Sequence, residues 1–516
     1  MDNNTNFNEV NSETSTNTFS GEISPAPKKK SPLGLIIGII VAIVVFIACA
    51  IGAFAFILLS NPTAKVTKAV VATLSDSDKT ASEYLQLDKL TENTANGAYQ
   101  SAFHLNLDDI QSDMSADLEP ILALAPSLSV ETATDIQNQK ASSDIDFICG
   151  GTPLVTLNCF ADGTTFGIAA PDYYDGSLSF DTMTLAEDFN NSYMRSIAGT
   201  EELTEEVNQN YFETLKQQAD FWTAYSTNYA EDNAALLKAM TVEKTDSADI
   251  SINQKKVTAV GYLVTIPGEN VRTFLDNANT LLENDNLKDS FAELESQLGT
   301  ITFPENFICT IYVADGKMVR FTYNDDFTVD TESMNLDATI DWTGVAHAND
   351  EINSTINLTD TTTEESFAIT CSSTVTNEDN EFRHLYGFTL KNNSYDETVG
   401  GTLTCLLNTA DGTFTLDSNI SDDTESVFTI NMSGAFSNVA DGYFTADVSD
   451  ASLAIPSDNM SLTLSGDYSI QALDGEVTIP DGTLRPIFEM DETDCQDLGQ
   501  EVIGNLMSSP IGSFLQ

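Results

Sequence analysis

Apolar and polar residues alternate along most of the second half of this chain, which is the pattern of half-buried β-strands. From residue 303 onward, each run places its apolar side chains on one face, and tight-turn pairs such as Asp315-Gly316 separate the runs. Such pairs favour hairpins between neighbouring strands. The pattern predicts a meandering antiparallel sheet over residues 301–490, with one buried and one solvated face.

The preceding part of the body mixes strand and helix patterns. Residues 97–170 alternate as strands do, with Asp162-Gly163 as a hairpin turn. Further strands are predicted at residues 242–252 and 256–266, joined by Asn253-Gln254. Apolar residues at helical spacing predict helices at residues 62–74, from Thr200 onward, from Pro267 to Leu282, from Leu287 to Leu298, and at 491–516.

These patterns together predict an α+β, β-dominated fold, in which one N-terminal transmembrane helix precedes a large antiparallel β-meander body with a few covering helices. A large sheet must cover its apolar face. Three ways remain open: packing of the predicted helices, closure of the sheet, or a bound apolar ligand.

The predicted membrane segment is residues 33–59, which contain no charged side chain and follow Lys28, Lys29 and Lys30. A bilayer core of about 30 Å requires about 20 helical residues, so this stretch is long enough to cross it. The basic flank places the N-terminus in the cytoplasm and the body outside it, at the cell membrane. Residues 1–32 contain few large apolar residues and are expected to be disordered.

Alternatives to a plain signal anchor rest on details of the same stretch. Its apolar run continues beyond the length usual for a cleaved signal peptide. The run Phe46-Ile47-Ala48-Cys49 is similar to a lipoprotein attachment box, but apolar residues still follow the cysteine. An uncleaved anchor is therefore favoured. Gly34 and Gly38 have the spacing that allows close helix approach, so they are candidates for a homodimer contact.

The division of the chain that follows from these patterns has five parts. They are a cytoplasmic tail (1–32), a transmembrane helix (33–59), a mixed strand and helix domain (60–300), an antiparallel β-sheet domain (301–490) and a C-terminal helix (491–516).

The net charge of the chain limits the classes of partner that it can bind. It has 21 Lys and Arg against 79 Asp and Glu, a formal net charge of −58. A polyphosphate would be repelled, which excludes nucleic acid as a partner, and direct adhesion of the body to an anionic bilayer is disfavoured. The predicted lipid contact is therefore residues 33–59 alone. The strong acidity is typical of a soluble surface protein.

Six cysteines lie outside the predicted membrane segment. Five of them fall on the apolar side of their strands: Cys149, Cys159, Cys309, Cys371 and Cys405. Free, buried thiols are therefore favoured. A Cys149–Cys159 disulfide between neighbouring strands remains the main alternative. Trp342 is in phase with the same apolar positions, which predicts that it is buried.

The sequence offers no signature of catalytic, cofactor-binding or metal-binding residues. The histidines, His104, His347 and His384, are far apart and lack partners at zinc-ligand spacing. Ser457-Asp458-Asn459 matches one element of the penicillin-binding-protein set without the others. Acid pairs are so frequent that their proximity carries no information about a glycosidase site.

The layout resembles that of uncharacterised single-pass, membrane-anchored, β-rich extracytoplasmic proteins of Gram-positive bacteria. Residues 253–266, together with the helix pair up to Leu298, are similar to a strand-then-helices unit of such families. The same arrangement is similar to half-barrel lipid carriers of bacterial envelopes, in which helices cover a curved sheet. The resemblance implies an extracytoplasmic body and supplies no functional residues.

The favoured function is that of a non-enzymatic, membrane-anchored surface protein that binds a partner or organises the envelope. A carrier or sensor of a lipid or other apolar ligand is the first alternative, and it requires an apolar cavity of several hundred Å³. An envelope hydrolase is the second, and it requires a cleft with carboxylates of perturbed pKa.

Overall fold

The structure of this chain is a computed structural model in which β-strands predominate. It describes residues 62–74, 76, 80–111, 125–198, 200–213, 215–216, 235–236, 238–252, 255–273, 301–302, 304–329, 332–423, 425–480 and 483–509.

The strands form one 22-stranded sheet in which almost every neighbouring pair is antiparallel. In the first part of the chain they are β1 (Ala98–Gln111), β2 (Ser127–Asp135), β3 (Lys140–Cys149), β4 (Thr152–Asp162), β5 (Thr165–Ala169), β6 (Ser177–Asp181), β7 (Thr241–Lys244), β8 (Ala248–Ile252) and β9 (Lys255–Pro267). The remaining strands are β10 (Ile301–Thr302), β11 (Asn306–Ala314), β12 (Lys317–Val329), β13 (Glu332–Trp342), β14 (Glu351–Asp360), β15 (Ser366–Glu378), β16 (Glu381–Asn392), β17 (Glu397–Asn408), β18 (Thr413–Asp422), β19 (Glu425–Ala440), β20 (Tyr443–Ile455), β21 (Met460–Ala472) and β22 (Leu484–Pro486).

The order of the strands in space differs from their order in the chain at several places. The meander from β11 to β21 follows the sequence, and β1 then pairs with β21, so that β1 to β6 extend the same sheet. At the other end β9 pairs with β11, which makes the sheet continuous across residue 300. The short β22 pairs with β6 and is parallel to it.

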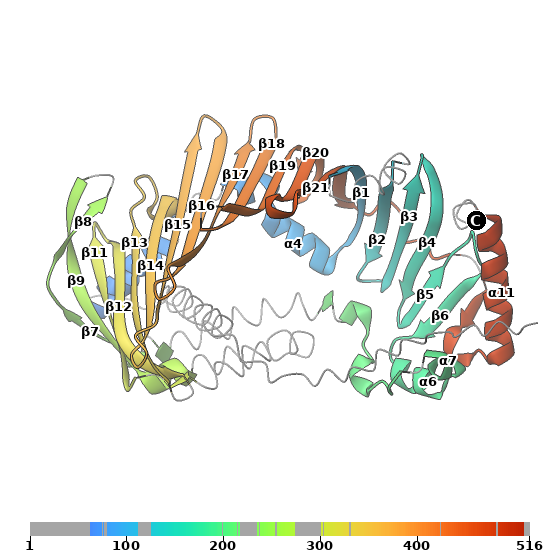
Figure 1. Cartoon of the computed structure of the whole chain (residues 1–516), viewed down its shortest axis with the longest axis horizontal. Helices are drawn as coiled ribbons and strands as arrows, with labels where there is room; N and C mark the ends of the chain where they lie inside the picture. Colours follow the sequence, from blue (N-terminus) through green and yellow to red (C-terminus); the bar gives the residue numbers. More distant parts are fainter. Residues whose placement is uncertain are drawn as a thin grey trace, which may run out of the picture.

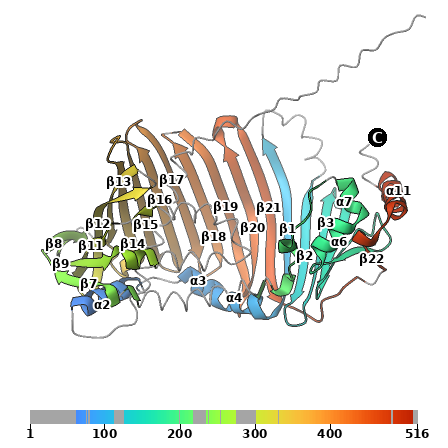
Figure 2. The same ribbon diagram turned by 90° about the horizontal axis from the view of Figure 1, so that it is seen from below.

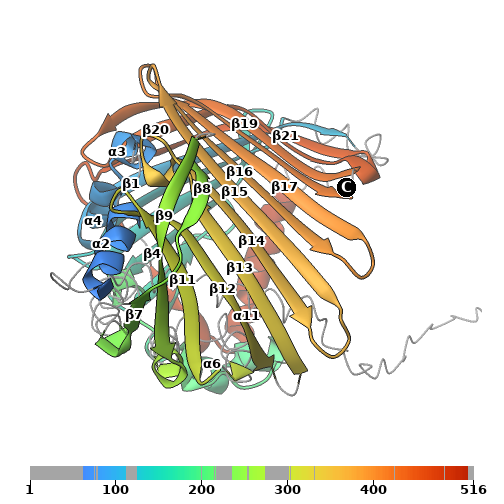
Figure 3. The same cartoon turned by 90° about the vertical axis from the view of Figure 1, so that its left-hand side faces the viewer.

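The sheet bends into an arch that runs from β7, β8 and β9 at one end to β6 and α11 (Glu492–Ser508) at the other (Figure 1). Seen from the β9 end, the strands cross the view obliquely, which shows the strong twist of the sheet (Figure 3). Tight turns close the predicted hairpins. At Asp315-Gly316 both residues have positive φ angles, 49° and 80°, as a two-residue hairpin turn requires.

Three helices from the start of the body lie along one rim of the sheet: α2 (Pro62–Leu74), α3 (Thr80–Leu85) and α4 (Leu87–Asn96) (Figure 2). The helices α6 (Leu185–Asn191), α7 (Tyr193–Ala198) and α11 lie at the β6 end (Figure 1). The short 3₁₀ segments are η2 (Glu205–Val207), η3 (Ala348–Asp350), η4 (Pro456–Asp458) and η5 (Ile487–Glu489). The helices at 62–74 and within 491–516 confirm the sequence pattern.

Within the residues that the structure describes, the largest hydrophobic core lies between α2 and the apolar face of strands β9 to β14. Val66 and Val70 of α2 are fully buried there, and Trp342 is buried as predicted. Because neighbouring residues in register share a face, the apolar alternation of each strand adds one row to the same core.

Polar contacts fix α2 to the sheet. The buried Thr73 hydroxyl accepts a hydrogen bond from Met318 N at 2.7 Å, and the same oxygen lies 3.0 Å from the Met318 carbonyl. Just beyond the helix, Asp76 bonds to Lys317 Nζ, and its carboxylate accepts hydrogen bonds from Ala348 N at 2.7 Å and His347 Nδ1 at 3.2 Å. The first helix of the body is thus attached to the β11–β12 hairpin and to η3.

The predicted fold class is wrong. The described residues are β-dominated rather than α+β, because the alternating pattern continues through both halves of the body and joins their strands in one sheet. That fold class also included a transmembrane helix. In the described part of the chain, no helix has both the length and the apolar character that a bilayer crossing demands.

The helix predicted from Thr200 onward is also wrong over its first residues. Asn190 bonds to both backbone groups of Leu203, accepting from its N–H and donating to its carbonyl oxygen, each at 2.8 Å. These bonds hold residues 201–204 in a non-helical conformation, and a 3₁₀ turn follows at Glu205–Val207. The strand predicted at 242–252 is divided into β7 and β8.

Several predictions concern residues outside the described ones. These are the tail at 1–32, the membrane segment at 33–59 with Gly34, Gly38 and Cys49, the Asn253-Gln254 turn, and the helices beyond residue 273, including Leu282 and Leu287 to Leu298. Pro267 is the last residue of β9, and helical residues begin at Gly268 with Val271 fully buried.

Candidate functional site

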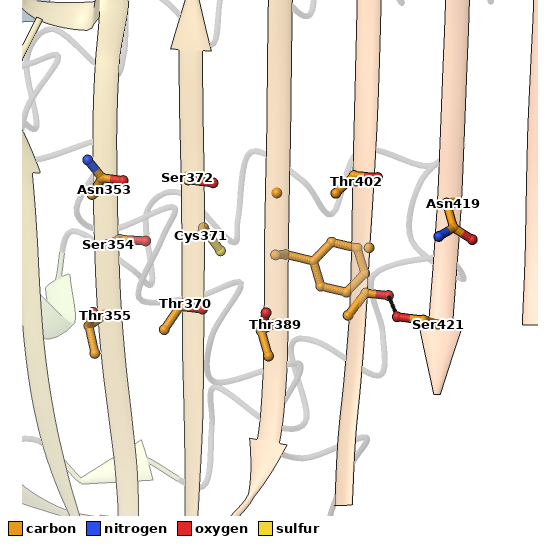
Figure 4. A pocket seen from close by; sticks show the side chains of 14 residues that line it. Asn353, Ser354, Thr355, Thr370, Cys371, Ser372, Thr389, Thr402, Asn419 and Ser421 are labelled. Carbon is orange, nitrogen blue, oxygen red and sulfur yellow. Dashed lines mark hydrogen bonds between the residues drawn. The ribbon is translucent and has the colours of Figure 1, made fainter. Parts of the chain in front are cut away.

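A polar groove crosses five neighbouring strands, β14 to β18. Ten of its 14 lining residues belong to the face opposite the apolar core, and the other four, Ser354, Cys371, Phe388 and Gly401, belong to the apolar face. The volume of the groove is about 490 Å³. Figure 4 shows its lining side chains spread over these strands. Two rows of residues in register line it. One row is Asn353, Ser372, Gly387, Thr402 and Asn419, and the other is Thr355, Thr370, Thr389, Gly400 and Ser421.

The two rows follow directly from the strand pattern. Side chains alternate between the faces of a strand, so two residues on one face are about 7 Å apart along it. The apolar positions of β14 to β18 occupy one face, and the intervening Thr, Ser and Asn residues must occupy the other. Threonine suits such positions because its branched side chain packs well on a pleated surface.

Two glycines create the hollow in the rows. A Cβ atom at Gly387 would lie 2.8 Å from Ser372 Oγ, and one at Gly400 would lie 3.3 Å from the carbonyl oxygen of Phe388. Each row therefore lacks one side chain where its neighbours carry a hydroxyl group. At Gly400 the missing side chain leaves room for a ligand atom to approach the backbone, whereas at Gly387 the Ser372 hydroxyl already lies over part of that space.

The groove is uncharged although the chain has a net charge of −58. Within the described part of the chain, the hydroxyl groups of Thr370, Ser372, Thr389 and Thr402 make no hydrogen bond to the protein. Each hydroxyl offers one donor and two acceptor positions. The groove can therefore form several neutral hydrogen bonds with a ligand and offers no ion pair.

At the β18 end of the groove, the lining side chains form hydrogen bonds with the protein. Asn419 Oδ1 accepts a hydrogen bond from Ser426 Oγ at 2.5 Å, and Ser421 Oγ donates to the carbonyl oxygen of Gly400 at 3.4 Å. These contacts orient the amide of Asn419 so that its NH₂ group is available as a donor.

The other large cavities among the described residues differ in character. One of about 530 Å³ lies where β9 passes into the helix at Gly268, and its lining includes Glu269, Arg272 and Glu305. Another of about 170 Å³ lies on β1 to β3 and β21, and Glu131 and Asp144 line it. Charged side chains line both of these cavities, unlike the groove on β14 to β18.

Among the described residues, a serine and a histidine lie within the distance that a nucleophile and its general base require. His384 Nε2 lies 2.8 Å from Ser373 Oγ on the apolar face, and Cys405 is directly opposite His384. Burial lowers the pKa of His384 and raises the pKa of the Cys405 thiol. A raised thiol pKa is the reverse of what a cysteine nucleophile needs.

The three histidines lie in separate places. His104 Nδ1 is 2.7 Å from Asp467, His347 contacts Asp76, and His384 contacts Ser373. Among the described residues, no group of three His, Cys, Asp or Glu side chains has the geometry to hold a metal ion. The Ser457-Asp458-Asn459 triplet forms part of an exposed 3₁₀ turn between β20 and β21.

The six described cysteines are free thiols. Cys149 and Cys159 do not pair, because Cys149 is opposite Thr152 and Cys159 is opposite Ser143 in the register of β3 and β4. Cys309 is buried as predicted, and burial raises its pKa to about 12. Cys371 is exposed, so the prediction of a buried thiol is wrong at that position.

The sequence pattern did not point to the groove. Each of its strands carries ordinary β-forming polar residues, and their alignment becomes visible only with the register of five strands. Gly387 and the Gly400-Gly401 pair are the one local signal, since glycine within a strand marks close backbone approach or a gap in the side chains.

Comparisons with known proteins add no family. No family model and no curated protein match the chain. Among solved structures, a double mutant of transferrin binding protein B from Haemophilus parasuis is 8% identical, with 73% of this chain and 76% of that chain covered and a TM-score of 0.13. OmpT, an outer membrane protein of Vibrio cholerae, is 6% identical, with 72% and 96% covered and a TM-score of 0.14. At such scores these similarities carry no argument about this protein.

Proposed function

We propose that this protein is a non-enzymatic binding protein and that its groove on β14 to β18 binds a neutral, hydroxyl-rich ligand, namely a glycan. The observation that carries the proposal is a set of hydroxyl groups, in an uncharged hollow, that make no hydrogen bond within the described part of the chain. Sugar hydroxyls both donate and accept hydrogen bonds, as do the Thr and Ser hydroxyls of the groove.

Charge supports a neutral ligand over a charged one. An anion would approach a chain with a net charge of −58 and find no cationic side chain in the groove. A cation would be attracted over long range but would find no carboxylate in the lining to pair with. A neutral polar ligand exchanges its bonds to water for bonds to the protein without such a penalty.

The expected affinity is modest. Hydrogen bonds between neutral groups contribute about 0.5–1.5 kcal/mol each after exchange with water. The groove lining contains Phe388 as its one aromatic residue, and that residue belongs to the apolar side of β16. Dissociation constants in the range of about 10 μM to 1 mM are therefore expected for short ligands.

The proposed place of action is the outer side of a cell membrane. The support comes from the sequence: the acidic, Thr- and Asn-rich body, and the uncharged apolar residues 33–59 after three lysines. Protease treatment of intact cells tests the location. Cleavage of the body without cell lysis is expected, and a protected body would contradict an extracytoplasmic location.

A binding screen tests the function. Full-length protein in a detergent without a sugar headgroup is titrated with neutral chito- and cello-oligosaccharides and with the anionic hyaluronan and polygalacturonate. Binding of a neutral glycan is expected, with at least a tenfold preference over the anionic ones. Binding of the anionic glycans alone, or of none of the panel, would refute the proposal.

Variants locate the binding in the groove. Ser372→Asp and Thr402→Asp each place a carboxylate in the lining, and a roughly tenfold loss of affinity is expected because the charge must be desolvated. Thr376→Asp is the matched control. It changes an exposed residue on the same face of β15, beyond the groove, and is expected to leave the affinity unchanged.

A carrier of an apolar ligand is the second candidate, and the apolar face of β16 favours it. Tyr386 and Phe388 on this face are 41% and 43% exposed. An acyl chain could lie across them and bury apolar surface. Native mass spectrometry of the purified protein tests this function: a lipid mass that denaturation releases would support it, and a bare protein mass would favour the glycan-binding function.

A further inference from the structure

The polar face contains a row of six threonines that extends far beyond the groove. Each is directly opposite the next on the neighbouring strand: Thr310, Thr322, Thr339, Thr355, Thr370 and Thr389. We call this row the threonine ladder. It crosses six consecutive strands, from β11 to β16, without interruption.

The ladder and the groove form one continuous line. Thr355, Thr370 and Thr389 belong to both, and Gly400 and Ser421 continue the row onto β17 and β18. Neighbouring strands are about 4.8 Å apart, so the six threonines span about 24 Å and the whole row spans about 34 Å. A short ligand can fill the groove, whereas a polymer can follow the entire row.

The ladder remains uncharged where its surroundings are charged. On the adjacent row of the same face, Arg320 forms a bidentate ion pair with Asp341, with distances of 2.5 and 2.7 Å. Asp337 and Asn324 occupy the next row on the other side. Over β12 and β13 a ligand that follows the threonines therefore passes between the Arg320–Asp341 pair on one side and Asp337 on the other, and it meets the methyl and hydroxyl groups of the threonine side chains.

From this alignment we infer that the ligand of the groove is a linear neutral polysaccharide, which lies across the strands along the threonine ladder. The inference rests on the proposed glycan-binding function and adds the class of ligand and its direction. Sugar rings present both C–H faces and hydroxyl edges, which match the methyl and hydroxyl groups of threonine. The regular strand spacing suits an extended polymer with a regular repeat.

The simplest structural reason for the ladder is sheet stability. Threonine favours strands, and directly opposite Thr–Thr pairs stabilise an antiparallel sheet without any ligand. The two roles differ in what they require of the hydroxyl groups. A Thr→Val exchange keeps the β-branched shape and the strand preference, but it removes the group that bonds to a sugar.

Ligand length provides the test. Full-length protein in a detergent without a sugar headgroup is titrated calorimetrically with chitobiose and chitohexaose. The hexamer is expected to bind at least about tenfold more tightly than the dimer, because it reaches threonines beyond the groove. Equal affinity for the two would overturn the inference.

Two pairs of substitutions localise the effect of length. The double variant Thr322→Val and Thr339→Val changes the ladder outside the groove. It is expected to weaken hexamer binding about three- to tenfold and to leave dimer binding unchanged. The double variant Thr370→Val and Thr389→Val changes the groove and is expected to weaken both. The control Thr374→Val and Thr376→Val alters the same face elsewhere and is expected to change neither.

The outcomes separate the inference from the function beneath it. In one outcome the groove variant abolishes dimer binding, but the outer ladder variant leaves hexamer binding unchanged. This result would overturn the inference that a polymer follows the ladder, and it would retain the groove as a glycan-binding site. Absence of binding for both chitin oligomers and their cellulose counterparts overturns both. Urea unfolding of each variant confirms that a loss of binding does not reflect a loss of fold.

Discussion

The apolar face of this sheet is tightly packed over strands β9 to β14 and half exposed over β16 and β17. Phe321 in the first region is 6% exposed, and Phe388 on the same face in the second region is 43% exposed. The strand patterns of the two regions are alike, so the residues themselves do not account for the difference. In the packed region α2 adds Val66 and Val70 to the core, whereas the ring of Phe388 lies over Gly401 of the next strand.

The polar faces of the two regions differ as well. Over β12 and β13 that face carries the Arg320–Asp341 ion pair and the bond from Asn335 to Asp326. Over β14 to β18 it carries the uncharged groove with its free hydroxyl groups. We therefore expect the packed region to contribute most of the folding stability and the open region to bind the proposed glycan. The following predictions test this division.

Two cysteines on the same apolar face give the largest expected contrast. Burial raises the pKa of Cys309 to about 12, so at neutral pH its reactive thiolate is about a thousandfold scarcer than for a thiol of pKa 9.0. Cys371 is exposed. Iodoacetamide is expected to alkylate Cys371 in the folded protein and Cys309 only after unfolding, as peptide mass spectrometry would show. Alkylation of both at similar rates would contradict the packed core.

A matched pair of phenylalanines compares packing energies directly. Phe321→Ala leaves a cavity in the core and is expected to lower the free energy of unfolding by about 3–5 kcal/mol. Phe388→Ala removes a half-exposed ring and is expected to cost about 1 kcal/mol or less. Urea denaturation followed by fluorescence measures both. Equal losses would mean that the apolar face of β16 is as well covered as that of β12.

The attachment of α2 should depend on one hydroxyl group. Thr73→Val leaves the buried Met318 N–H without its acceptor, which is expected to cost about 1–3 kcal/mol. Hydrogen exchange of the α2 amides should increase more than that of β16. Thr91→Val, which alters an exposed threonine of α4, serves as the control and should have little effect on stability.

The smallest predicted effect concerns the pH dependence of the same attachment. Burial raises the pKa of Asp76, but bonds from Lys317, Ala348 and His347 outweigh this and hold the pKa below its ordinary value of 3.8. A depressed carboxyl pKa stabilises the fold above the unfolded-state value, and this stabilisation disappears as the pH falls through the folded-state value. The urea midpoint of the wild type should therefore exceed that of Asp76→Asn at pH 5, where the Asp76 carboxylate is fully charged. Below about pH 4 the difference should shrink, and a constant difference down to pH 2 would contradict this role of Asp76.

Local patterns predicted much of this fold. Alternation located most strands, the Asp-Gly pairs located hairpin turns, and helical spacing gave α2 at Pro62–Leu74. The pairing of β1 with β21 could not be predicted, because no local feature records which distant edge a strand joins. The helix expected from Thr200 failed because the side chain of Asn190 holds Leu203.

The candidate site was less accessible to prediction than the fold. Thr355, Thr370 and Thr389 are ordinary strand residues in the sequence, separated by 15 and 19 positions. They line up because each hairpin fixes a register, and a shift of one residue in any strand would turn its polar side chains to the other face. A site whose residues are aligned only by the pairing of several strands can therefore be recognised only when the register of all those strands is known.

The central claim is that the hollow at Gly387 and Gly400 binds a neutral glycan, and filling it tests the claim most directly. The decisive measurement is a calorimetric titration of chitohexaose into full-length wild type, Gly400→Ser and Gly499→Ser. Gly499→Ser is the control, because Gly499 lies in α11 with open space around it. The account predicts binding by the wild type and the control, and at least a tenfold loss in Gly400→Ser. Undiminished binding by Gly400→Ser would contradict it.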